Sequence, residues 1–99
     1  MSANEVVVTA CIAEVHTLRY TPAGLPALQL VLDHQSQVQD VQGSRQVKLA
    51  LKAMAFGALA ERLASQAVGS SWRFRGYLSN SRLGKSVVLQ IQDFSQELL

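Results

Sequence analysis

Basic side chains recur in two stretches of this chain of 99 residues, at positions 45–52 and 73–75. Ammonium and guanidinium groups bind phosphate oxygens and a tyrosine ring can stack on a base, so such a set suits a single-stranded nucleic acid. The candidate nucleic-acid-binding residues are Arg45, Lys48, Lys52, Arg73, Arg75, Tyr77, Arg82 and Lys85. Each cation alone is equally explained as solubilising charge. Four of them on two strands that we predict to be neighbours, with Tyr77 among them, favour a binding surface.

The distribution of charge supports this interpretation better than the total does. The chain has nine Lys and Arg residues and seven Asp and Glu residues, which gives a formal net charge of only +2. Between Arg45 and Lys85, however, all charged residues are basic except Glu61. Because the other acids precede or follow this block, we expect one surface of the folded protein to be positive.

Nothing in the sequence supports an enzyme. It has no glycine-rich phosphate loop and no paired-carboxylate motif, and no serine or cysteine nucleophile is placed by a motif beside Asp33-His34. His16 and His34 lack partners at a metal-ligand spacing. We therefore predict no catalytic residue, no cofactor and no metal. Cys11 is the only cysteine, which excludes an intrachain disulfide and suits a reducing cytoplasm.

Length and hydropathy predict one small domain spanning residues 1–99. No apolar run approaches the roughly 18 residues needed to span a bilayer, and the first residues lack a basic leader. We expect a cytoplasmic protein that does not contact a membrane.

Period-two alternation predicts strands in the first half of the chain. Residues 5–15 are apolar and predict a first strand. A turn containing Pro22, Gly24 and Pro26 leads into a second strand over 25–36, and the polar residues 37–44 predict a loop or a mobile hairpin tip. Residues 45–54 alternate cleanly, which predicts a third strand with one face in water.

The second half begins with helical spacing. Apolar residues from Phe56 to Ala67 predict an amphipathic helix over 55–67, ended by Gly69. Residues 72–79 return to period two and place Trp72, Phe74 and Leu78 on the buried face. After a turn at 80–84, a fifth strand is marked by Val87, Leu89 and Ile91.

Three strands, a helix and two strands predict an all-β fold, a five-stranded OB-fold barrel with one helix between strands three and four. An α+β sandwich with the same element order remains an alternative.

Two motifs resemble a known family. The pattern Pro22-x-Gly24-x-Pro26-x-x-x-Leu30-x-Leu32-Asp33-His34-x-Ser36, with Arg45-Gln46 opening the third strand, resembles primosomal replication protein N (PriB). The passage from Ala55 through Gly69-Ser-Ser-Trp-Arg-Phe-Arg-Gly-Tyr-Leu-Ser79 resembles single-stranded DNA-binding protein (SSB), of which PriB is a relative.

This resemblance implies a non-enzymatic homodimer that binds single-stranded DNA as a primosome component. It would stabilise the PriA helicase on DNA and recruit DnaT-like or other loading factors during replication restart. The apolar first strand is a physical reason to expect dimerisation, because an unpaired apolar edge promotes aggregation. Lys48 stands where well-known family members have tryptophan, so a protein-interaction module with weak or lost DNA binding is the alternative. An RNA-binding, cold-shock-like role is less favoured because clustered strand aromatics are missing.

Overall fold

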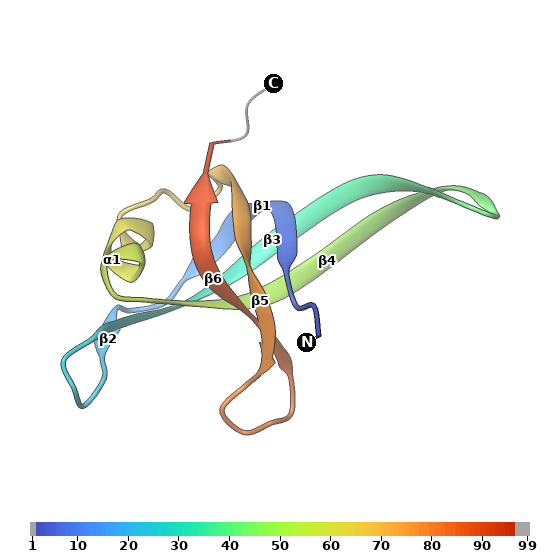
Figure 1. Ribbon diagram of the computed structural model, residues 1–99. Coiled ribbons are helices and arrows are strands. Elements are labelled where there is room, and N and C mark those ends of the chain that lie inside the picture. Colours follow the sequence, from blue (N-terminus) through green and yellow to red (C-terminus); the bar gives the residue numbers. More distant parts are fainter. Residues whose placement is uncertain (1, 97–99) are drawn as a thin grey trace.

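The computed structural model describes residues 2–96, and its long strands wrap around one another beside a short helix (Figure 1). The elements in chain order are β1 (Val6–Val15), β2 (Arg19–Tyr20), β3 (Pro26–Asp40), β4 (Gly43–Phe56), α1 (Ala58–Ala64), β5 (Ser71–Asn80) and β6 (Val87–Ser95). The described part of the chain contains no helix of the length and apolarity that crossing a membrane requires.

The sheet closes on itself. Its strands lie in the order β1-β5-β6-β4-β3-β2, and β1 also pairs with β3. All pairings are antiparallel except the short parallel contact of β4 with β6, where Ala53 pairs with Leu89 and Met54 with Gln90. The five long strands therefore form a closed barrel, which confirms the expected OB-fold and excludes the sandwich. The two-residue β2 only extends the sheet beyond β3.

Inward-facing side chains from every long strand and from α1 fill the barrel. Leu28, Leu30 and Leu32 are fully buried, as their alternation predicts. The largest other fully buried side chains are Ile12, Leu63, Phe74 and Leu89. Trp72 is half-buried: its ring meets the Phe94 ring edge-on at 5.1 Å, and its Nε1–H donates to Ser70 Oγ at 2.9 Å. Its place against the core agrees with the strand periodicity.

The helix is shorter than the sequence predicts. It spans Ala58–Ala64, and Ala55 and Phe56 belong to β4 instead. Both residues pair with β3, and Gly57, with φ of +71°, turns the chain while its N–H donates to the Pro26 carbonyl at 2.9 Å. Backbone pairing with β3 thus overrides the helical spacing of the first residues.

Of the two predictions for residues 37–44, a loop or a hairpin tip, the structure shows the hairpin. Strands β3 and β4 pair without interruption from Ala27 with Phe56 to Asp40 with Gly43, leaving a turn of Val41 and Gln42. Figure 1 shows this hairpin projecting from the barrel, with its tip on the opposite side from α1. Both faces of the projecting ribbon are in contact with water, so its residues carry no clear apolar alternation although the backbone is fully paired.

Strands β5 and β6 approach each other closely at Gly76. The register between β5 and β6 shifts between Arg75 and Gly76, and Leu78, which lies past this shift, is exposed rather than buried. Val87, the first residue of β6, is also exposed. A Cβ atom at Gly76 would lie 1.9 Å from the Gln90 carbonyl oxygen, so only glycine permits β5 and β6 to approach this closely.

We expect Gly76→Ala to destabilise the protein by about 3 kcal/mol, the upper end of the usual range for overpacking, because the added methyl meets backbone atoms that cannot rotate away. Urea unfolding followed by circular dichroism measures the loss.

The matched control is Gly84→Ala in the β5–β6 turn. Gly84 has φ of +71° but open space around its Cβ position, so only the backbone conformation is penalised, by roughly 1–2 kcal/mol. Equal losses at the two glycines would show that β5 and β6 can separate to accept the methyl group.

Candidate nucleic-acid interface

Lys48 and Lys52 project from the outer face of β4, on the side opposite the core. Lys48 lies across from Gln35 and Lys52 across from Val31 of β3, and both lysines are exposed. Because alternate residues of a strand share a face, the same outer surface includes Met54. The period-two pattern of the third strand thus placed these two lysines correctly on its wet face.

Tyr77 joins this surface from another strand. Met54 pairs with Gln90 of β6, and Gln90 pairs with Tyr77 of β5. Side chains of paired residues point to the same side of a sheet, so Tyr77 lies on the outer side, in the same cross-strand row as Met54. Gln90 Nε2–H also donates to Ser79 Oγ at 3.1 Å, which fastens β6 to β5 beside the tyrosine.

Phe56 is a further residue of this surface, which the sequence interpretation assigned to the buried side of the helix. It ends β4 two residues beyond Met54, pairs with Ala27, and is 42% exposed. The signal that identifies it is the alternation of Lys48, Lys52 and Met54, which continues without a break to Phe56. We call the surface formed by Lys48, Lys52, Phe56 and Tyr77 the aromatic face.

Two connections extend from the strands that carry the aromatic face. Arg19 of β2 pairs with Ala27, which places Arg19 in the same cross-strand row as Phe56. Arg82 and Lys85 lie exposed in the β5–β6 turn, which is closed by a hydrogen bond from Ser81 N–H to the Ser86 carbonyl at 2.7 Å. In OB-folds, the loops between strands one and two and between strands four and five flank the binding face.

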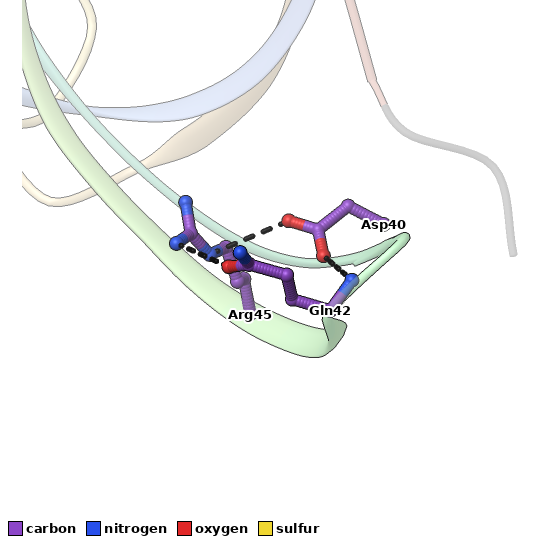
Figure 2. A network of polar contacts seen from close by, with 3 residues as sticks. All are labelled: Asp40, Gln42 and Arg45. Atoms are coloured by element: carbon purple, nitrogen blue, oxygen red, sulfur yellow. Dashed lines mark hydrogen bonds and ion pairs between the residues drawn. The ribbon is translucent and has the colours of Figure 1, made fainter.

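Arg45 lies elsewhere, at the tip of the β3–β4 hairpin (Figure 2). Its Nε is 3.3 Å from Asp40 Oδ2, its Nη2–H donates to Gln42 Oε1 at 3.5 Å, and Asp40 Oδ1 accepts from the Gln42 backbone N–H at 2.8 Å. The carboxylate offsets the charge of Arg45 and helps to order the turn. Seven residues of extended strand, about 23 Å, separate Arg45 from Lys52.

Arg73 and Arg75 also lie apart from the lysines. The expectation that their strand neighbours the lysine strand was wrong, since β6 lies between β4 and β5. Arg73 stands in a row with Thr9 and Ser95, and Arg75 in a row with Val7 and Asp93. We call this outer surface of β1, β5 and β6 the arginine face.

Within residues 2–96, the one ion pair joins Arg45 to Asp40, so the cations of both faces have no carboxylate within salt-bridge distance. The guanidinium of Arg62, on α1, instead lies 4.8 Å from the centre of the Phe94 ring, away from both faces. In this same part of the chain no three His, Cys, Asp or Glu side chains gather in a way that could hold a metal ion.

Comparison with known proteins agrees with this arrangement. A family model described as "Another single-strand binding protein family" matches residues 4–93. The replication restart protein PriB of Bordetella pertussis is 39% identical over 79 residues, which are 80% of this chain and 74% of that protein. The chain belongs to the PriB family of SSB-like proteins. This family comprises DNA-binding proteins rather than enzymes.

Two further relatives support the assignment over nearly the whole chain. The PriB of Nitrosomonas europaea is 30% identical over 91% of this chain and 84% of that protein. The structure of PriB from Ralstonia solanacearum superimposes with a TM-score of 0.88 at 29% identity, covering 98% of this chain and all of that one. The barrel described above is therefore shared with a solved PriB structure.

The position of Phe56 on the outer face has a consequence for stability. We expect Phe56→Ala to cost only about 1 kcal/mol, because much of the ring is already in water and truncation leaves no closed cavity. Leu63→Ala, at a fully buried position of α1, should cost roughly 2–5 kcal/mol. Chemical denaturation of both variants measures the difference. A loss at Phe56 as large as that at Leu63 would mean that the ring supports the core.

Proposed function

We propose that this protein binds single-stranded DNA on the aromatic face, as a primosome component in replication restart. The observation that carries the proposal is that two half-exposed aromatic rings, from β4 and β5, lie with Lys52 on one outer surface, which Lys48 extends along β4. The family assignment and the restart proteins among its relatives support the same function.

Each residue type has a separate task in this binding. Phe56 and Tyr77, 42% and 40% exposed, offer ring faces on which bases can stack. Lys48 and Lys52 bind phosphates along β4, and Arg82 and Lys85 do so from the β5–β6 turn. Stacking and phosphate contacts are available to every base, so binding would depend little on sequence.

We expect Phe56→Ala to weaken binding of labelled oligo-dT by about tenfold or more, since stacking contributes roughly 1–3 kcal/mol per base. Lys48→Gln combined with Lys52→Gln should weaken binding and lower the slope of log affinity against log salt by about 0.7 for each phosphate that the protein no longer neutralises. Fluorescence anisotropy at several salt concentrations measures both effects.

Arg62→Gln is the control, because it removes one positive charge from α1 and leaves the aromatic face intact. Weakening of binding in this variant equal to that of the lysine pair, or affinity that does not respond to salt, would contradict a DNA site on the aromatic face.

The partners that we propose follow from the relatives. The relatives are named replication restart proteins, which supports a role in restart. From the resemblance to the PriB family we further propose a cytoplasmic location and, as partners, the PriA helicase and DnaT-like or other loading factors. The alternative is a protein-interaction module of the primosome with weak DNA binding. Lys48 favours that alternative, because the tryptophan of well-known family members would add a third ring to the aromatic face.

We further propose that the protein is a homodimer formed through β1. The strand pairs with β5 from Val6 to Cys11 but with β3 only from Cys11 to Val15, so within residues 2–96 no strand pairs with the second edge of residues 6–10. Val7, 47% exposed, lies on this part of the strand. An open, uncharged edge of this kind is a template for pairing with a second strand.

The hydrogen bonds of Thr9 and Ile12 show which backbone groups are available. His34, on β3, lies with Nδ1 2.6 Å from the Thr9 carbonyl, whereas the N–H and C=O of Ile12 bond to Ser70 and Gly69. Because successive residues of a strand point their backbone groups to opposite edges, Val7 and Thr9 face the open edge and Val6 and Val8 face β5. A second copy would therefore pair through Val7 and Thr9.

We expect Val7→Pro to convert the dimer to a monomer, since proline removes an N–H that pairs across the interface but none that pairs with β5. Sedimentation velocity measures the mass, and circular dichroism checks the fold. Val7→Thr, which keeps the N–H and the branched side chain, should remain dimeric. A wild-type monomer at micromolar concentration would disprove the dimer.

A further inference from the structure

The arginine face is a second cationic surface that the aromatic face does not use. Arg73 and Arg75 are exposed on the outer side of β5, two residues and therefore about 6.6 Å apart along the strand. With Val7, Asp93 and Ser95, they line a shallow depression. Neither guanidinium has a carboxylate partner within salt-bridge distance among the described residues, although Asp93 is in the same row as Arg75.

Pairing of two copies through β1 would make this surface continuous across the dimer. The sheet would then run β5, β1, β1 of the second copy and β5 of the second copy. Because Val7 and Thr9 must pair with the same residues of the other strand, their side chains in both copies point to the side that carries the arginines. The two β5 strands would lie three strand spacings, about 14 Å, apart.

We propose that the dimer binds an acidic segment of a partner protein on this four-arginine face, across its two-fold axis. The inference rests on the proposed dimer and adds a binding site to it. Guanidinium groups bind carboxylates in a bidentate manner, and their spacing along β5 matches the repeat of alternate side chains in an extended peptide. Val7 of each copy would give the middle of the face an apolar strip for the peptide's uncharged groups.

An acidic peptide fits this face better than a second length of DNA does. Among the described residues, the rows of Arg73 and Arg75 hold no aromatic side chain, and Tyr77, on the same side of β5, lies two residues beyond Arg75, so a base could stack only at the end of this face. Asp93 lies beside each Arg75 and would repel a chain that carries a charge at every phosphate. A peptide can instead place an amide or hydroxyl donor next to this carboxylate.

The test uses a fluorescein-labelled glutamate-rich peptide and its glutamine counterpart, titrated with the full protein at low salt. We expect one glutamate peptide to bind per dimer and the glutamine peptide not to bind. Arg73→Gln combined with Arg75→Gln should weaken peptide binding at least about tenfold, the change that removal of one charge-assisted hydrogen bond produces. The matched control, Lys48→Gln with Lys52→Gln, removes the same charge from the other face and should retain peptide binding.

The outcomes separate this inference from the proposals on which it rests. A dimer that binds oligo-dT but not the glutamate peptide would overturn the inference alone. Binding of two peptides per dimer, or full peptide affinity in monomeric Val7→Pro, would also overturn it. An arginine variant that loses oligo-dT binding but keeps peptide binding would overturn it as well, because this face would then be a DNA site. A wild-type monomer in sedimentation would remove the dimer and the shared face together.

Discussion

Closure of the sheet through β4 and β6 is the contact on which the other features depend. Only two residue pairs make it, Ala53 with Leu89 and Met54 with Gln90. It joins strands far apart in the sequence in a parallel pairing that no hairpin enforces. Small side chains permit it, because Ala53, Ala55 and Ala60 are all buried where β4 leads into α1. Without this contact, β5 and β6 would not lie beside β4, and Tyr77 would not share an outer surface with Lys52 and Phe56.

The strands were predictable because one side of most of them is buried. Leu28, Leu30 and Leu32 recur at alternate positions, and the structure buries all three fully. The same logic fails in the projecting hairpin, where backbone hydrogen bonds hold residues 37–44 without a core to select apolar side chains. It also fails at Phe56, because an aromatic residue at the end of a strand and one on a helix face give the same local pattern. Only pairing with Ala27 distinguishes the two.

The candidate site was predictable in its residue types but not in its grouping. Alternation shows that Lys48 and Lys52 share a face and that Arg73 and Arg75 share another, because each pair lies on one strand. Whether the two pairs meet depends on strand order, which is set by contacts between distant residues. The insertion of β6 between β4 and β5 separates them. A single set of cations in the sequence thus becomes two groups on different strands, one on the strand of Phe56 and one beside valine and threonine of β1, with Tyr77 between them.

The open edge of β1 connects these surfaces to the proposed dimer. Edge strands are usually shortened, charged or covered, yet residues 6–10 are uncharged and Val7 is half-exposed. His34 covers only part of this edge. Its Nδ1–H donates to the Thr9 carbonyl, and its Nε2, 2.9 Å from the Ser36 hydroxyl, can accept a hydrogen bond from that group. A carbonyl oxygen has two lone pairs, so Thr9 can still accept from a second strand. The imidazole therefore holds β1 against the base of the projecting hairpin without closing the edge, and the backbone groups that remain available there are those through which the proposed dimer would pair.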